Sequence, residues 1–178
     1  MEKFKANDNK NEEHEINYRQ FNKKLELLNQ ILSLISDINQ ASDEKEVKDC
    51  IPALLQYTGE YTDADRVYIF ELMSEKQDYY SNTFEWCREG IVPQIDNLIR
   101  ISADSMPVWH EKFLRGETII IHDLEKICET MPLEYDILKV QDIHSLLVLP
   151  LFANTQLSGF IGLDNPELVN PGVSISLL

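Results

Sequence analysis

The sequence lacks the features of an extracellular, zinc-binding or membrane-spanning protein. Its three cysteines, Cys50, Cys87 and Cys128, form no CxxC pair, and this count and spacing argue against a disulfide framework or a zinc site. The longest apolar run, Ser145–Phe152, is far shorter than the roughly 20 residues of a membrane-spanning helix. The N-terminus has no apolar segment of a secretory signal. These absences predict a soluble, cytoplasmic chain.

Basic residues are scarce as well, with 16 Lys and Arg against 31 Asp and Glu and a formal net charge of −15. This charge would repel nucleic-acid phosphates and anionic lipids, so we expect no nucleic-acid binding and no membrane contact by this segment. The histidines lack HxH or HExxH spacing, so no metal site is indicated. Hydrophobic residues make up 43% of the 178 residues, enough for one globular core with an appendage.

The N-terminal region divides into a tail and a helix. Residues 1–15 are rich in Asn, Lys and Glu and predict a flexible tail. Residues 16–40 carry two adjoining apolar stripes at helical spacing. One neighbouring element normally covers one stripe, so we expect the other to form a homodimer interface; the alternative is a helix wholly buried in its own domain. The predicted interface is Phe21, Leu25, Leu28, Leu32 and Ile35, and the second stripe is Leu27, Ile31, Leu34 and Ile38.

A second helix is expected after Asp43, which with Glu46 forms a capping box. Pro52 is expected to kink this helix or to begin its final stretch. From Asp65 the apolar period becomes that of a strand, and two such segments form a hairpin. Strict alternation predicts two faces for the second strand. One face carries Tyr80, Asn82, Phe84 and Trp86, and the other carries Ser81, Thr83, Glu85 and Cys87.

The remaining pattern completes an α+β order. A long connection follows Gly90, and a short helix over 105–115 places Met106, Trp109 and Phe113 on one side. A strand at 118–121, one or two short helices over 124–140 and a second hairpin over 145–165 come next. This order predicts a central, mostly antiparallel sheet, with the N-terminal helices on one face and a helix and loop excursion on the other.

Three stretches resemble GAF domains of bacterial signalling proteins, over about residues 40–166. They are ADRVYIF at 64–70, SNTFEWC with the following GI and PQIDNL at 81–98, and SLLVLPL with GFIGLDN at 145–165. The middle stretch looks like a GAF subgroup often fused to diguanylate cyclase (GGDEF) or histidine kinase modules. The resemblance implies a GAF domain at 41–166, a GAF/PAS-like architecture and a fused C-terminal output domain. Residues 167–178 would begin a truncated helix leading to it.

GAF domains bind cyclic nucleotides, tetrapyrroles, other small molecules, or apparently nothing. The Asn-Lys, Phe and Asp-Glu set of cyclic-nucleotide-binding members has no counterpart here. Cys87 and Cys128 are followed by Arg88 and Glu129, whereas the Cys that attaches a bilin is commonly followed by His. The resemblance therefore implies a sensory or regulatory module that binds a small ligand or relays a signal, without selecting a ligand or cofactor.

The aromatic-rich region from the first hairpin onward is the candidate ligand site, because aromatic walls with a few polar groups are typical of small-molecule pockets. The alternative is that these aromatic residues are ordinary core. The candidate residues are Asn82, Phe84, Trp86, Asn97, Trp109, Ile120 and His122.

Two further functions stay open. Small GAF proteins that resemble free methionine sulfoxide reductases work through loop cysteines, so Cys87 and Cys128 would be nucleophile and resolving thiol in an enzyme of that kind. A purely structural dimerisation module is the other. No carboxylate pair stands out as acid and base, so we expect this chain to be a sensor and not a catalyst, with any catalysis in the output module.

Overall fold

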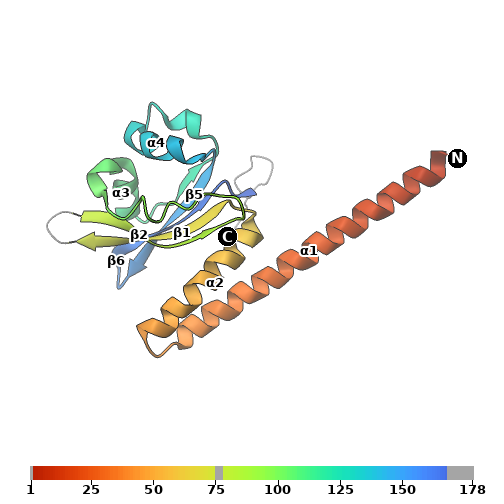
Figure 1. Ribbon diagram of the computed structural model, residues 1–178, viewed down its shortest axis with the longest axis horizontal. Helices are drawn as coiled ribbons and strands as arrows, with labels where there is room; N and C mark the ends of the chain where they lie inside the picture. The colour runs from red at the N-terminus through yellow and green to blue at the C-terminus, as the bar shows by residue number, and fades with distance from the viewer. Residues whose placement is uncertain (1, 75–77, 168–178) are drawn as a thin grey trace.

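The structure is a computed structural model that describes residues 2–74 and 78–167 (Figure 1). Apart from Glu167, the helix expected over 167–178 lies outside the described residues. The helices are α1 (Glu2–Gln40), α2 (Glu44–Thr62), α3 (Pro107–Leu114) and α4 (Pro132–Leu138), with short 3₁₀ turns η1 (Ala103–Ser105), η2 (Leu124–Ile127) and η3 (Lys139–Gln141). The strands are β1 (Arg66–Ser74), β2 (Asp78–Cys87), β3 (Ile101–Ser102), β4 (Ile119–Ile121), β5 (Leu146–Ala153) and β6 (Gln156–Asp164).

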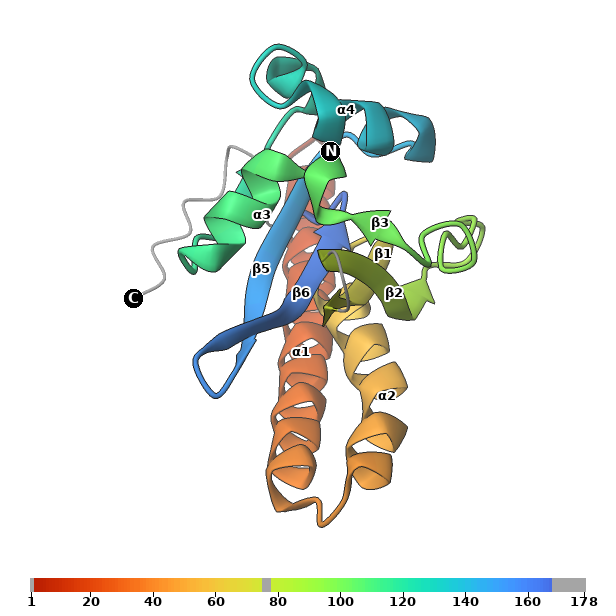
Figure 2. The same cartoon turned by 90° about the vertical axis from the view of Figure 1, so that its left-hand side faces the viewer.

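Within the described residues, the strands form one sheet in the order β3-β2-β1-β6-β5-β4, and each neighbouring pair is antiparallel. Helices α1 and α2 lie on one side of this sheet, whereas α3 and α4 cover the other side (Figures 1 and 2). The predicted α+β architecture is therefore confirmed. Strand β3 is an addition, because the sequence analysis expected only a loop there, and its two residues pair with Tyr79 and Tyr80.

Helix α2 begins as its capping residues predict. The Asp43 side chain accepts a hydrogen bond from the Glu46 backbone N–H at 2.9 Å, and the Glu46 carboxylate accepts one from the Ser42 N–H at 2.7 Å. These bonds satisfy amide groups that a helix start leaves without intrahelical partners. The helix continues through Pro52 to Thr62, so the proline does not end it.

Helix α1 corrects the prediction for the N-terminus. It begins at Glu2, so residues 2–15, expected as a flexible tail, are helical. The physical reason is that Glu and Lys are good helix formers, and extending an existing helix costs far less than nucleating one. Nearer the domain, Leu27 is buried, and Ile31, Leu34 and Ile38 are half-buried. The other stripe is exposed along its whole length, with fractions from 36% at Leu28 to 64% at Phe21.

Two hydrophobic clusters lie on opposite faces of the sheet. The larger cluster fills the α3 and α4 face and contains Met106, Trp109 and Phe113 as the helical spacing predicted. The smaller cluster lies on the α2 face and contains Leu55 and Val67. Strand β1 contributes to both, because alternate side chains point to opposite faces of a sheet. The larger cluster, on the α3 and α4 face, also contains residues that line a cavity.

A β-bulge in β2 overturns the predicted faces of that strand. Ile69 is paired with Phe84, but the next residue, Phe70, is paired with Asn82, so Thr83 is the extra residue. An extra residue reverses the alternation beyond it. Phe84 and Trp86 consequently pack in the α2 cluster, opposite to Asn82. The sequence alone has no Gly or Pro signal for this bulge, so strict alternation predicted the wrong side.

Candidate functional site

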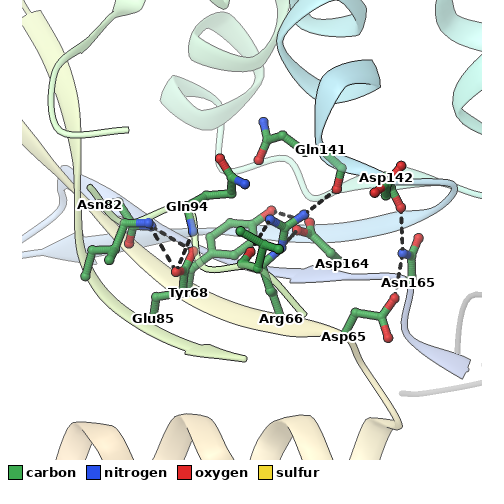
Figure 3. A network of polar contacts seen from close by, with 12 residues as sticks. Asp65, Arg66, Tyr68, Asn82, Glu85, Gln94, Gln141, Asp142, Asp164 and Asn165 are labelled. Carbon is green, nitrogen blue, oxygen red and sulfur yellow. Dashed lines mark hydrogen bonds and ion pairs between the residues drawn. The ribbon is translucent and has the colours of Figure 1, made fainter. Parts of the chain in front are cut away.

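A cavity lies between the sheet and the α3 and α4 excursion. Its free volume of about 40 Å³ has room for about three water molecules, each needing about 10–15 Å³. Most of its wall is apolar, and its polar residues belong to two hydrogen-bonded groups (Figure 3), one around Arg66 and Asp164 and one around Asn82 and Glu85. The apolar wall is Tyr68, Phe70, Leu98, Ile101, Met106, Trp109, Ile137, Leu138, Ile143 and Phe160. The polar residues are Arg66, Asn82, Glu85, Gln141 and Asp164.

The first group contains a buried ion pair between the two central strands. Arg66 Nε donates to Asp164 Oδ2 at 2.9 Å, and both side chains are at most 4% exposed. The Tyr68 hydroxyl donates to the other oxygen, Oδ1, at 2.9 Å. Burial raises the pKa of Asp164 to about 6, although Arg66 and Tyr68 oppose this shift. Burial also raises the pKa of Tyr68 well above its usual value, so its hydroxyl remains a donor.

The same guanidinium holds two loops over the cavity. Its Nη2 donates to the Gln141 carbonyl at 2.7 Å, and its Nη1 donates to the Val92 carbonyl at 3.4 Å. Arg66 and Gln141 also line a second, more polar pocket of about 290 Å³, whose wall includes the exposed Val92 and Val140. Arg66 therefore connects β1, β6 and both covering loops through one charged group.

Asn82 and Glu85 hold the loop after β2. Glu85 Oε2 accepts from the backbone N–H groups of Gln94 and Ile95 at 2.9 and 3.1 Å. Glu85 Oε1 accepts from Asn82 Nδ2 at 3.3 Å, and the Asn82 backbone N–H donates to the Leu98 carbonyl at 3.0 Å. A change at Asn82 would therefore act directly on the loop that covers the cavity.

Two lining residues have side-chain atoms without a protein partner. Within the described residues, Asn82 Oδ1 and Trp109 Nε1 are buried and make no hydrogen bond. Glu134 Oε2 is a third such atom, but Glu134 does not line this cavity; its other oxygen accepts from the N–H groups of Val108 and Trp109 at the start of α3. Unpaired buried polar groups cost free energy unless water or a ligand satisfies them.

The structure separates the residues that were expected to form the ligand site. Asn82 and Trp109 line the cavity, whereas Phe84 and Trp86 lie on the α2 face because of the bulge. Asn97 is exposed, and its side-chain N–H donates to Gln94. Ile120 is 49% exposed on β4, and His122 is exposed just beyond it. Of the candidate residues, Asn82 and Trp109 are those that line the cavity.

The sequence analysis missed Arg66, Glu85, Gln141 and Asp164. Arg66 and Asp164 are charged residues at the ends of two apolar strands, and this placement was the available signal. Asp164 is the last residue of β6 and is 1% exposed. Glu85 was assigned to the opposite face, and the bulge brings it to the cavity.

The cysteines give little support for thiol chemistry. Burial, with Glu85 nearby, raises the pKa of the Cys87 thiol to about 12, so Cys87 is protonated and weakly nucleophilic at neutral pH. Cys128 is exposed beyond η2. In the part of the chain that the structure describes, no group of three or more His, Cys, Asp or Glu residues is arranged to hold a metal ion.

With this architecture in place, the chain belongs to the GAF domain family, whose model matches residues 46–171. It is similar to the methanogenesis regulatory histidine kinase FilI of Methanothrix harundinacea, with 32% identity over 126 residues. The match covers 67% of this chain and 14% of FilI, so the chain corresponds to a small part of that relative. The chain is thus a GAF sensory domain of the type found in signalling proteins.

Solved structures of other proteins share the fold at low sequence identity. The blue-light-absorbing PixJ GAF domain of Thermosynechococcus elongatus gives a TM-score of 0.56 at 20% identity, over 71% of this chain and 74% of that chain. NreA of Staphylococcus aureus, mutated in its nitrate binding site, gives a TM-score of 0.52 at 14% identity, over 67% and 88% of the two chains. Among the described residues, no helix is both long and apolar enough to span a membrane.

Proposed function

We propose that this chain is a cytoplasmic, non-catalytic sensory domain that binds a small molecule in the cavity above β1, β2 and β6. The observation that carries the proposal is the combination of a mostly apolar wall with buried polar atoms that have no protein partner. Ligand pockets commonly combine an apolar surface with a few orienting polar groups. The raised pKa of Cys87 favours this sensor over the enzyme that would use Cys87 and Cys128.

Native mass spectrometry after incubation with a small-molecule extract of the producing cells tests the proposal. We expect a discrete added mass on the wild-type chain. Leu98→Trp would fill the cavity that Leu98 lines and should abolish the added mass. Ile99→Trp is the matched control, because Ile99 is 58% exposed, and it should retain the added mass. A wild-type chain that acquires no added mass, or a Leu98→Trp chain that retains it, would contradict the proposal.

We further propose that ligand binding regulates a fused output module, such as a histidine kinase or a diguanylate cyclase. Similarity to FilI supports the kinase. Autophosphorylation or cyclic-di-GMP synthesis by the full-length protein is the measurement. In the Leu98→Trp variant the extract should no longer change that activity, whereas in the Ile99→Trp variant the response to the extract should remain. An output that responds equally in both variants would contradict this role.

A parallel homodimer through α1 is the proposed route for the signal. The seam Phe21, Leu25, Leu28, Leu32 and Ile35 is exposed, whereas the neighbouring stripe packs towards α2. The steps of four, three, four and three between seam residues match the a and d positions of a coiled coil. The helix contacts α2, which in turn contacts β1 and β2. A shift of β2 would therefore reach the dimer interface through α2.

A further inference from the structure

Two residues that line the cavity each have one buried side-chain atom that the protein leaves unpaired, an acceptor on Asn82 and a donor on Trp109. Asn82 is 5% exposed and Trp109 is 3% exposed, so bulk water does not reach these side chains freely. Within the described residues, Asn82 Oδ1 and Trp109 Nε1 have no hydrogen-bond partner. An indole N–H can only donate, and an amide oxygen can only accept. A ligand that satisfies both must therefore carry a donor and an acceptor of its own.

The orientation of the Asn82 amide follows from its neighbour. Its Nδ2 lies 3.3 Å from Glu85 Oε1, and an ionised carboxylate can only accept hydrogen bonds. The opposite orientation would place two acceptor oxygens against each other. The amide oxygen is therefore the atom left for a ligand, and it requires an N–H or O–H group.

The charges around the cavity disfavour an anionic ligand. Glu85 bonds directly to Asn82, and Asp164 lines the same cavity (Figure 3). The buried cation Arg66 is already paired with Asp164 at 2.9 Å and donates to two loop carbonyls. A carboxylate ligand would bring a further negative charge beside Glu85 and would offer no donor to Asn82 Oδ1.

We propose that the ligand is a small uncharged amphipathic molecule with an N–H or O–H donor for Asn82, an acceptor for Trp109 and a short apolar body. A primary amide is the simplest chemical class with these features. The proposal rests on the proposed function, since it names the ligand class of the same cavity. A free volume of about 40 Å³ limits the ligand to a few non-hydrogen atoms in this conformation.

The test uses three primary amides that differ only in the length of the alkyl chain: acetamide, propionamide and butyramide. Each is compared with its carboxylate, and propionamide also with methyl acetate, a neutral molecule of similar size that has an acceptor but no donor. The readout is the indole N–H signal of Trp109 in ¹H–¹⁵N spectra, identified by its loss in Trp109→Phe. The Trp86 signal is an internal control, because Trp86 packs on the opposite face of the sheet.

At least one amide should move the Trp109 signal downfield in a saturable manner while the Trp86 signal stays in place. Methyl acetate and the carboxylates should bind at least about tenfold more weakly, since a buried amide left unpaired is costly. Asn82→Leu should reduce the preference for propionamide over methyl acetate to less than about threefold. The Trp86 signal of this variant reports whether its fold is intact, and the comparison of ligands in the wild type does not depend on the variant.

Three results would overturn the ligand class: carboxylates that bind as tightly as amides, methyl acetate that binds as tightly as propionamide, or amides that leave the Trp109 signal unmoved. None of these would remove the cavity as a ligand site, because the added mass on the wild-type chain and its loss in Leu98→Trp decide that question separately. Loss of both the added mass and the Trp109 response would indicate that ordered water satisfies Asn82 and Trp109.

Discussion

Arg66 Nε and Asp164 Oδ2 lie 2.9 Å apart, although 98 positions separate the two residues in the sequence and both side chains are almost completely buried. The two residues face each other across the β1 and β6 pair. Because Arg66 also donates to Val92 and Gln141, this ion pair fixes both covering loops to the centre of the sheet. Stability and access to the cavity therefore depend on the same charged group.

Arg66→Met should lower the free energy of unfolding by about 3–5 kcal/mol, because it leaves the Asp164 carboxylate buried without its cation. Arg66→Met with Asp164→Leu removes both charges and should be more stable than the sum of the single changes by about 2 kcal/mol or more. Urea unfolding of the four proteins measures this coupling. Arg115→Met is the control: Arg115 pairs with Glu111 and Glu117 at the surface, so its loss should leave the free energy of unfolding nearly unchanged.

The raised pKa of Asp164 predicts a dependence of stability on pH. Burial moves this pKa from 3.8 to about 6 in the folded protein, and unfolding returns it to its usual value. Between about pH 4 and 6 the folded state holds a proton that the unfolded state has released. The resulting stabilisation is complete below pH 4 and is lost as the pH rises through 6.

Comparison with Asp164→Asn isolates this effect from other carboxylates. The free energy of unfolding of the wild type, relative to that of the variant, should fall by about 1 to 2 kcal/mol between pH 5 and 7.5. Urea unfolding at the two pH values gives the difference. A constant or rising difference would show that Asp164 is ionised throughout this range in the folded protein.

Local patterns predicted most elements of this fold but only part of its site. Met106, Trp109 and Phe113 have helical spacing, so their burial together followed from the sequence. The Arg66 and Asp164 contact depends on the pairing of β1 with β6, which are almost 100 residues apart, and no local period encodes it. The bulge at Thr83 also depends on tertiary packing and not on a local pattern. It places Trp86 under α2 and brings Glu85 to the cavity.

Trp86 and Gly59 provide a direct test of the bulge. A Cβ atom at Gly59 would overlap the six-membered part of the Trp86 indole, so Gly59→Ala should destabilise the protein by about 1–3 kcal/mol despite the higher helix propensity of Ala. Phe lacks the second ring, so Gly59→Ala should be close to neutral in a Trp86→Phe background. A double-mutant cycle from urea unfolding should give a coupling above about 1 kcal/mol. Equal costs in both backgrounds would mean that Trp86 does not pack on α2.

The α1 seam predicts that association can be removed without loss of the fold. Leu28→Glu and Leu32→Glu place charges at adjacent positions of the exposed stripe, where two helices of a homodimer would bring like charges together. Each should shift the sedimentation profile from dimer to monomer and weaken association at least about tenfold, with an unchanged circular dichroism spectrum. Ser33→Glu adds the same charge at an exposed position outside the stripe and should remain dimeric. A wild-type chain that stays monomeric at high concentration, or equal effects of all three substitutions, would place the signalling interface elsewhere.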